Sequence, residues 1–329
     1  MSSLPSERER KLVVRSRAKT SPEYGKSPEE RTIEEHLRYG IINLDKPRGP
    51  TSHEVVAWVK RLLEVKKAGH GGTLDPQVSG VLPVALEKST RVLQVLLTGG
   101  KEYVGVMRLH ADAGEDRVRE VFAEFTGKIV QRPPVRSAVK RSLRVRRVYY
   151  LELLEMDGRY VLFRVGCEAG TYIRKLCHDI GEVLGTGAHM TELRRTKSGC
   201  FSAEDAVTLH DVCDAYHFWK EEGDERLLRR VVRCVEEGVR HLPKVVVRDS
   251  AVDALCHGAA LAVPGVVKLD AEIKKGDVVG VFTLKGELIA LGIAEMDTTT
   301  MLTSERGIAV KIDRVLMQPG TYPRAWKAG

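Results

Sequence analysis

The chain has 329 residues, enough for about two domains of ordinary size. Its 53 Lys and Arg outnumber its 45 Asp and Glu, and the formal net charge of +8 favours a polyanionic partner. No apolar run approaches the ~18 residues of a membrane-spanning helix, and the N-terminus has no signal-peptide core, so we expect no membrane association.

The six cysteines are spread along the chain without any Cys-x-x-Cys pair. This spacing is untypical of zinc sites and of disulfide frameworks. We therefore expect reduced, mostly buried thiols and a cytoplasmic protein.

The first 37 residues are polar and mixed in charge, and they predict an arm that becomes ordered by packing on another part of the molecule. Residues 40–44 form a short apolar run typical of a strand, and a turn follows at 46–50. Thr51 and Glu54 have the spacing of a capping box, so we expect a helix to begin there.

The segment from Ala68 to Val84 is rich in glycine and contains one Asp-Pro pair. Proline disfavours helical geometry at the preceding residue, so Asp75 is predicted to lie at the tip of a tight turn. Asp-Pro is also a favoured helix start, with Asp as the N-cap. Gly80 and Pro83 argue against that alternative because they leave little room for a helix. The segment lacks the Gly-Lys-Ser/Thr ending of a phosphate-binding loop.

Residues 103–109 and 160–165 are rich in β-branched and aromatic side chains and predict strands. Residues 172–184 fit an amphipathic helix. After residue 242 short apolar runs alternate with glycine turns, which is typical of a small β-barrel. In this part we expect Ser250 to cap a short helix that stops at Gly258.

A run of basic residues lies between the two predicted strands, without an acidic residue from 135 to 147. Most such runs are solvated surface, but this one is also suited to contacting RNA phosphates. Its members are Arg136, Lys140, Arg141, Arg144, Arg146 and Arg147.

Five segments together resemble the motifs of the TruB family of RNA pseudouridine synthases, and in particular its archaeal, dyskerin-like branch. The segments are residues 68–84, 101–104, 131–140, 170–176 and 192–196. Residues 244–316 resemble a PUA domain, a small RNA-binding barrel. The resemblance implies a mixed α/β (α+β) fold with a curved, largely antiparallel sheet, plus the PUA barrel. It divides the chain into an arm (1–37), a catalytic domain (38–240), a PUA domain (244–316) and a tail (317–329).

The resemblance also assigns roles to individual side chains. Asp75 corresponds to the nucleophile that opens the glycosidic bond of a uridine, and Arg174 to the arginine that pairs with it. Tyr103 corresponds to a tyrosine that stacks on the base and helps with proton transfer. Leu193 matches an apolar contact to the base, and His70 a histidine near it. Taken alone, each of these residues also has an ordinary structural explanation, such as a core aromatic or a surface arginine.

The family uses no metal or organic cofactor, so none is expected. Dyskerin-like proteins work with a box H/ACA guide RNA and with small Nop-type and Gar-type proteins on tRNA or rRNA, whereas bacterial TruB enzymes act alone on the T-loop uridine of tRNA. The PUA resemblance implies RNA contacts at Gly258, Ala259, Pro264 and Gly265.

Two other interpretations stay open from the sequence. A non-catalytic RNA-binding scaffold would explain the PUA domain and the basic run equally well. A metal-dependent hydrolase using His70 and Asp75 would need a further ligand cluster, and the sequence offers none.

Overall fold

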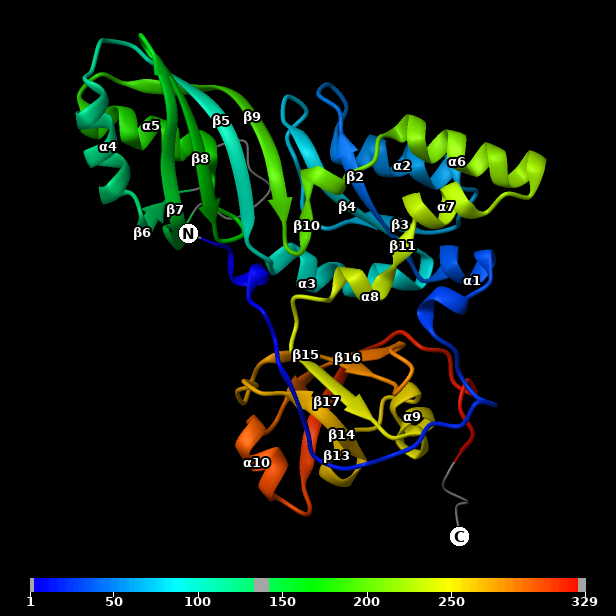
Figure 1. Ribbon diagram of the computed structural model, residues 1–329. Coiled ribbons are helices and arrows are strands. Elements are labelled where there is room, and N and C mark those ends of the chain that lie inside the picture. Colours follow the sequence, from blue (N-terminus) through cyan, green and yellow to red (C-terminus); the bar gives the residue numbers. More distant parts are fainter. Residues whose placement is uncertain (1–2, 133–141, 325–329) are drawn as a thin grey trace.

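The computed structural model describes residues 3–132 and 142–324, which form two parts built around separate β-sheets. In Figure 1 the larger sheet and most of the helices lie above, and the smaller sheet lies below. The N-terminal segment runs from one part to the other along the outside of the molecule.

The larger sheet has the strand order β11-β2-β4-β9-β5-β8-β7-β6, with β3 paired to β4 and β10 paired to β9. Strands β4 and β9 run parallel, and the other neighbouring strands are antiparallel. The sheet is visibly curved (Figure 1), and the expected fold class is confirmed. Its strands are β2 (Gly40–Lys46), β3 (Ala68–His70), β4 (Ser79–Leu86), β5 (Lys101–Leu109), β6 (Gly127–Gln131), β7 (Arg144–Asp157), β8 (Tyr160–Cys167), β9 (Ala188–Ser198), β10 (Phe201–Ser202) and β11 (Arg233–Cys234).

Helices bury the two halves of this sheet in separate apolar cores. Helices α4 and α5 pack against β5, β7 and β8, whereas α2, α6 and α7 pack against β2 and β4. Helix α2 begins at the predicted capping box, in which Thr51 accepts a hydrogen bond from the Glu54 amide. The helices of this part are α1 (Ile33–Arg38), α2 (Ser52–Leu62), α3 (Leu93–Thr98), α4 (Glu115–Glu124), α5 (Ile173–Leu184), α6 (Leu209–Glu222), α7 (Arg226–Val231) and α8 (Val235–Gly238).

The smaller sheet has the order β1-β14-β12-β15-β16-β17-β13, and α9 and α10 cover its core. The expected helix near Ser250 is present, but Ser250 does not cap it. Helix α9 begins at Asp249 after Arg248, so Ser250 lies inside the first turn. The elements are β1 (Leu12–Val14), β12 (Lys244–Val247), α9 (Asp249–Cys256), β13 (Leu261–Ala262), β14 (Val266–Asp270), β15 (Val278–Phe282), β16 (Leu288–Ala294), α10 (Thr298–Thr303) and β17 (Ile308–Val315).

The N-terminal arm binds to the smaller sheet. Its strand β1 pairs antiparallel with β14. Arg15 donates hydrogen bonds to the carbonyls of Met301 and Ser304, at 2.8 and 3.0 Å. The arm therefore adds an edge strand to a domain that lies more than 200 residues later in the chain.

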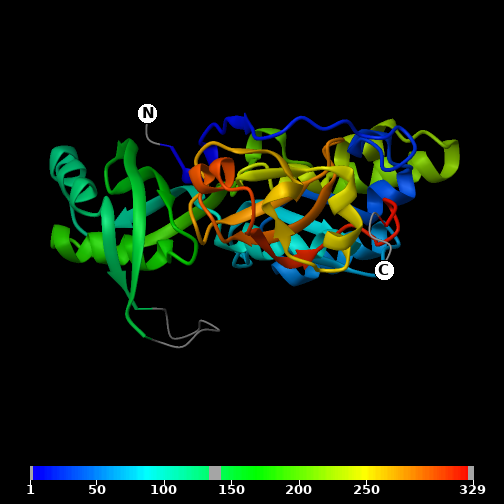
Figure 2. The ribbon, with the colours of Figure 1, turned by 90° about the horizontal axis from the view of Figure 1, so that it is seen from below.

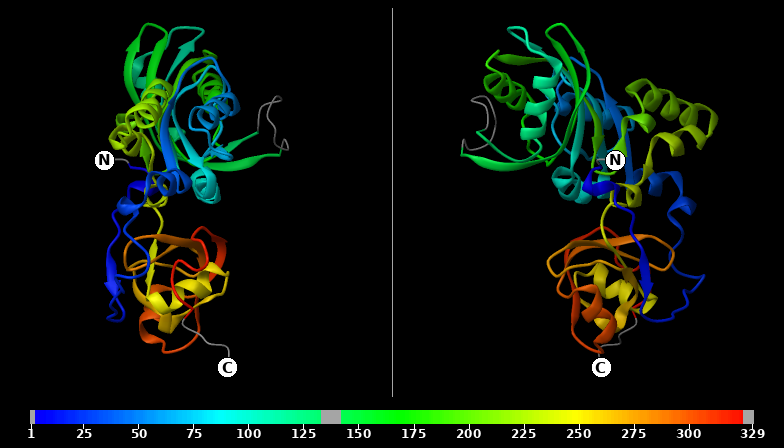
Figure 3. Two further views of the ribbon diagram at one scale, coloured as in Figure 1. Left: turned by 90° about the vertical axis from the view of Figure 1, so that its right-hand side faces the viewer. Right: turned by 60° about the vertical axis from the view of Figure 1, so that its left-hand side comes forward.

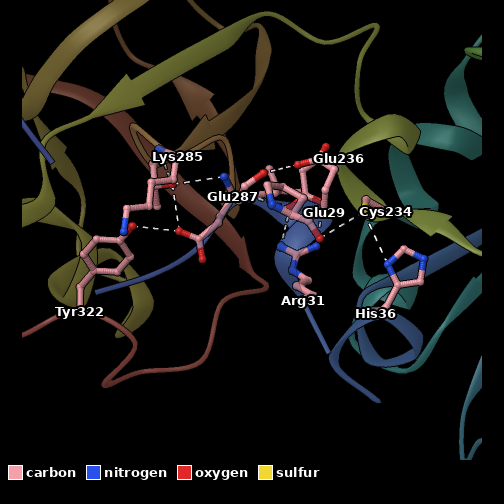
Figure 4. A network of polar contacts seen from close by, with 12 residues as sticks. Glu29, Arg31, His36, Cys234, Glu236, Lys285, Glu287 and Tyr322 are labelled. Carbon is pink, nitrogen blue, oxygen red and sulfur yellow. Dashed lines mark hydrogen bonds and ion pairs between the residues drawn. The ribbon is translucent and has the colours of Figure 1, made fainter. Parts of the chain in front are cut away.

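The two parts meet at a polar junction that the arm completes (Figure 4). The guanidinium of Arg31 forms a bidentate salt bridge with the Glu236 carboxylate, with N–O distances of 2.9 and 2.8 Å. Glu236 also accepts a hydrogen bond from the Leu288 amide at 2.9 Å. One carboxylate thus connects the arm, α8 and β16. An apolar cluster shared by both sheets, which includes Ile41 and Phe282, lies between the parts. These contacts fix the smaller domain relative to the larger one.

The parallel contact between β4 and β9 depends on the absence of a side chain at Gly80. Gly80 has φ +107°, and a Cβ there would lie 2.2 Å from the carbonyl oxygen of Arg195. We expect Gly80→Ala to lower the free energy of unfolding by about 2–6 kcal/mol, from backbone strain and overpacking together. Gly49→Ala is the matched control, because Gly49 has φ +116° but no atom near its Cβ position. Chemical denaturation of both variants measures the difference; equal losses would contradict the steric explanation.

Candidate active site

Asp75 lies at the start of a tight turn between β3 and β4. The Val78 amide donates a hydrogen bond to the Asp75 carbonyl at 3.0 Å, with Pro76 and Gln77 at the central positions of the turn. Proline is favoured at the first central position of such a turn. No helix begins here, so Asp75 is not an N-cap. Its side chain is 59% exposed, which presents the carboxylate to solvent.

The end of β2 and the start of α2 hold this turn in place. The ammonium group of Lys46 is fully buried and donates to the carbonyls of Pro47 and Val78, at 2.8 and 2.9 Å. Ser52, in the first turn of α2, exchanges hydrogen bonds with both the amide and the carbonyl of Leu74. The backbone on each side of Asp75 is therefore fixed by buried contacts, while its carboxylate is free to meet a ligand.

Arg174 comes to Asp75 from the first turn of α5. Its Nη2 lies 2.7 Å from Asp75 Oδ2, although 99 residues separate the two in the sequence. Gln131, at the end of β6, sets the start of this helix by bonding to both the amide and the carbonyl of Tyr172. Both side chains are about 60% exposed, so the ion pair contributes little to the stability of the fold. Its main effect is to orient the Asp75 carboxylate.

Tyr103 on β5 and Leu193 on β9 lie on the same face of the sheet. Tyr103 pairs with Arg195 across the two strands, and Leu193 lies two residues before Arg195 on β9. Paired residues point to the same face of a sheet, as do residues two apart on one strand, so Tyr103 and Leu193 share a face. Burial raises the pKa of the Tyr103 phenol; Arg195 opposes the shift and the charge of Asp75 adds to it. The charge of Asp75 is thus one of the influences on this phenol.

His70 lies at the end of β3, close to the turn that carries Asp75. Its ring meets the His53 ring edge-on, with 5.0 Å between centroids. Burial lowers the pKa of His70, and the neighbouring His53 and Arg195 lower it further. His70 is therefore a neutral ring on the wall of the site near pH 7, suited to contact and not to carrying charge.

Sequence reasoning did not single out two buried cations beside this site. Arg195 is 1% exposed and Lys101 4% exposed. Lys101 donates to the carbonyls of Leu96 and Gly99, at 2.9 and 2.6 Å. The signal for Arg195 was its spacing from Leu193, since residues two apart on a strand share a face. The positive charge of Arg195 contributes to lowering the pKa of both Lys101 and Lys46, after burial.

Burial lowers the pKa of Lys101 to about 7, with Arg195 as the second cause. In the unfolded chain Lys101 keeps the usual lysine pKa of about 10.5. Between about pH 7 and about pH 10.5 the unfolded chain therefore binds more protons than the folded protein. Lys101 makes the free energy of unfolding rise with pH in this range. The slope for one proton is at most about 1.4 kcal/mol per pH unit. We expect Lys101→Met to remove this part of the pH dependence.

Guanidinium denaturation at several pH values between about 7 and about 10 tests this prediction. Lys60→Met, on the exposed side of α2, is the control and is expected to keep the parent's slope. A Lys101→Met variant whose stability rises with pH as steeply as the parent's would contradict the assignment.

The basic run is only partly inside the described residues. Arg136, Lys140 and Arg141 lie outside them. Arg144, Arg146 and Arg147 lie at the start of β7, on the β6–β7 pair that projects from the body of the molecule (Figures 2 and 3). Arg146 lies 3.7 Å from the Glu168 carboxylate, an acid outside the run, whereas Arg147 is exposed. Part of the charge of this run is thus neutralised within the fold.

The four residues expected to contact RNA in the smaller domain lie close together after α9. Gly258, Ala259 and Pro264 are exposed, and Gly265 is half-buried. The arrangement leaves backbone accessible around β13.

Among the described residues, no group of three or more His, Cys, Asp or Glu side chains is placed to hold a metal ion. The helices in the described ranges are all too short or too polar to cross a membrane.

Comparison with known protein families gives a match along almost the whole chain. Residues 60–173 match the TruB family pseudouridylate synthase N-terminal domain, and residues 174–240 match the tRNA pseudouridylate synthase B C-terminal domain. Residues 243–316 match the PUA domain, and residues 2–56 match the DKCLD (NUC011) domain.

Similar proteins include probable tRNA pseudouridine synthases B of two archaea. The Methanopyrus kandleri protein is 62% identical over 323 residues, covering 98% of this chain and 96% of its own length. The Pyrococcus abyssi protein is 60% identical over 325 residues, covering 98% and 97%.

Two solved structures share the fold over nearly all of the chain. One, a Cbf5-Nop10-Gar1 complex, matches with a TM-score of 0.94 and 58% identity, covering 98% of each chain. The other, an H/ACA RNP bound to a substrate RNA containing 2′-deoxyuridine, matches with a TM-score of 0.93 and 56% identity, covering 98% of this chain and 100% of the other.

Proposed function

The chain belongs to the TruB family of pseudouridine synthases and is an isomerase that acts on uridine in RNA; we propose that Asp75 is its nucleophile and that a guide RNA selects its target. The observation that carries the first proposal is the 2.7 Å contact between Arg174 and Asp75. It brings together a helix start and a motif turn that lie 99 residues apart in the sequence. A carboxylate can attack, form a covalent intermediate and leave again.

We assign the other site residues by their positions around this pair. Tyr103 stacks on the target base and takes part in proton transfer, and Leu193 contacts the base from β9. His70 supplies a neutral contact. A uridine held in RNA structure must be flipped out to reach Asp75. The non-catalytic scaffold is disfavoured, because RNA binding alone gives no reason to bring Asp75, Tyr103 and Arg174 together.

For its partners, we propose a particle with a guide RNA and two small proteins of the Nop10 and Gar1 type. The support is the likeness to the chains in the solved complexes, which extends over both domains and the arm. The substrates would be tRNA, rRNA or both. Action without a guide on the T-loop uridine of tRNA is the second mode, and the names of the relatives favour it. We place the protein in the cytoplasm, which its six free cysteines support.

The PUA-type domain is proposed to hold the ACA end of the guide through Gly258, Ala259, Pro264 and Gly265. We expect a guide with a scrambled ACA to bind the intact protein at least about tenfold more weakly than the matched guide. Filter binding at one fixed salt concentration measures the ratio, because contacts with phosphates give a non-specific contribution that falls steeply with salt. Equal affinities would contradict ACA recognition by this domain.

Base-resolved mapping of pseudouridine separates the two modes of action. The assembled particle should modify the uridine that the guide pairs around, and a changed guide should move the modification. Modification of tRNA by the protein without any guide would assign the stand-alone mode instead. An absence of pseudouridine under both conditions, in a particle shown to be assembled, would favour the scaffold.

A further inference from the structure

Arg195 is a buried cation that no carboxylate contacts within the described parts of the chain. Its side chain is among the largest that are fully buried, and the ion pairs of the described residues do not include it. Its neighbour Arg194, in contrast, points to the partly exposed Asp45 and pairs with it at 2.8 Å. Burying an unpaired charge is costly, so the contacts of Arg195 must offset a large desolvation penalty.

The Arg195 guanidinium connects three elements that line the site. Its Nε donates to the Val81 carbonyl on β4 at 2.8 Å, and its Nη2 donates to the Gly72 carbonyl at 2.9 Å. Gly72 lies three residues before Asp75. Arg195 is also the cross-strand partner of Tyr103 on β5, and its charge acts on the Tyr103 phenol. From the position directly opposite Tyr103, one rigid planar group therefore ties the Asp75 loop to β4.

The same charge acts on the chemistry of the phenol. Burial raises the pKa of Tyr103, and the Arg195 charge is the main influence that favours the phenolate. Lys46 and Lys101 are also buried nearby, but burial lowers the pKa of each, so their charge is more easily lost. Burial lowers the pKa of Arg195 as well, but an arginine starts from a much higher value and keeps its proton under ordinary conditions. Arg195 is thus the permanent charge beneath Tyr103.

We propose that Arg195 is a positioning residue that acts through Tyr103: it holds the phenol against the target base and supports its role in removing the C5 proton. The proposal rests on the function proposed above. In the isomerisation the N1–C1′ bond breaks and a C5–C1′ bond forms. C5 then loses its proton to the Tyr103 phenolate. Tyr103 returns this proton to solvent and N1 takes up one proton from solvent, so the proton count is unchanged and the enzyme is regenerated. Arg195 need not touch the substrate.

A purely structural role for Arg195 makes a different prediction, and a double-mutant cycle separates the two. The variants are Arg195→Met, Tyr103→Phe and the double variant, each in the assembled particle under single-turnover conditions. If Arg195 acts through Tyr103, Arg195→Met should lower the rate about 10²-fold or more, in the range of a lost acid–base function. In the Tyr103→Phe background the same change should lower it by less than about threefold, because interacting sites are not additive.

Arg194→Met is the matched control, since it removes an adjacent arginine from the same strand. We expect its rate to stay within about threefold of the parent's, as for independent surface changes. RNA affinity of Arg195→Met should be unchanged within about twofold, because Arg195 is buried and not accessible to RNA. Fully independent, multiplicative effects of the Arg195 and Tyr103 changes would overturn the proposal.

The cycle requires a measurable rate from Tyr103→Phe. The rate of Asp75→Asn is the background with which the Tyr103→Phe rate is compared. A Tyr103→Phe rate above this background, together with the small further effect of Arg195→Met, supports the proposal. If the Tyr103→Phe rate is no higher than that of Asp75→Asn, the double variant gives no information, and the C5 isotope effect of Arg195→Lys described below decides the proposal. Failure of the parent particle to form pseudouridine would instead contradict the function itself.

A second variant keeps the proposal testable if Arg195→Met does not fold. Arg195→Lys retains the positive charge and loses the planar, forked donor. We expect a rate between those of the parent and Tyr103→Phe. We also expect a larger isotope effect when C5 of the target uridine carries deuterium, because C5 proton removal becomes slower. A reduced rate with an unchanged isotope effect would overturn the proposal in favour of a structural role.

Discussion

Asp75→Asn is expected to abolish pseudouridine formation, with a loss of at least about 10⁴-fold in the single-turnover rate, as for nucleophile removal in other covalent enzymes. Asparagine keeps the shape of the side chain but cannot form and release the covalent bond. The turn itself should persist, because the hydrogen bond from Val78 is made to the Asp75 backbone carbonyl. RNA affinity should stay within about threefold and stability within about 1 kcal/mol, since the Asp75 ion pair is largely exposed.

The control for this experiment is chemical purity, because deamidation of the introduced asparagine would restore the parent enzyme. Peptide mass analysis of the variant sets an upper limit on restored aspartate. Product formed by the variant above that limit in a single turnover would contradict the assignment of Asp75 as the nucleophile.

Arg174→Met should lower the single-turnover rate about 10²-fold, the usual cost of losing one oriented charge partner at a reacting group. Without the 2.7 Å contact the Asp75 carboxylate is free to turn away from the sugar and base. Lys175→Met is the matched control, because Lys175 follows Arg174 on α5 and pairs with Asp179 on the same helix. We expect its rate to stay within about threefold of the parent's. Equal losses in the two variants would contradict a specific role for Arg174.

Local chemistry made much of the fold predictable from the sequence. The capping box of Thr51 and Glu54 indicated the start of α2, and the Asp-Pro pair with Gly80 and Pro83 indicated a tight turn and not a helix start. The predicted cap of α9 was wrong. Asp249 and Ser250 both suit a helix start, and the structure uses Asp249 to accept a hydrogen bond from the Ser21 amide of the arm. That long-range contact has no signature in the local sequence.

The pairing of residues across the site was not derivable from local chemistry. Arg174 resembles a surface helical arginine until the topology of the sheet carries α5 to the Asp75 turn, and only the family resemblance supplied the pair in advance. Arg194 and Arg195 are adjacent and chemically identical in the sequence. Successive side chains of a strand point to opposite faces, so Arg194 reaches Asp45 at the surface and Arg195 enters the core. Which of the two faces the core depends on the register of β9 with β5 and β4.

The position of the arm also required the structure. Its charge pattern suggested a segment ordered by packing, whereas its pairing with β14 and the Arg31–Glu236 contact are set by residues far along the chain. The arm and the shared apolar cluster hold the smaller domain at a fixed place below the larger sheet. This arrangement suits a guide RNA that is held at one domain and presents its target to the other.

The most direct test of the central claim is a single-turnover reaction with an RNA that carries tritium at C5 of one guide-selected uridine. Isomerisation replaces the C5–H bond by a bond to the ribose, so tritium must be released as the product forms. We expect the parent particle to release tritium in an amount equal to the pseudouridine mapped at that position, and Asp75→Asn to release none above background. Pseudouridine formed at the parent's rate by pure Asp75→Asn, or no pseudouridine from the assembled parent particle, would contradict the central claim.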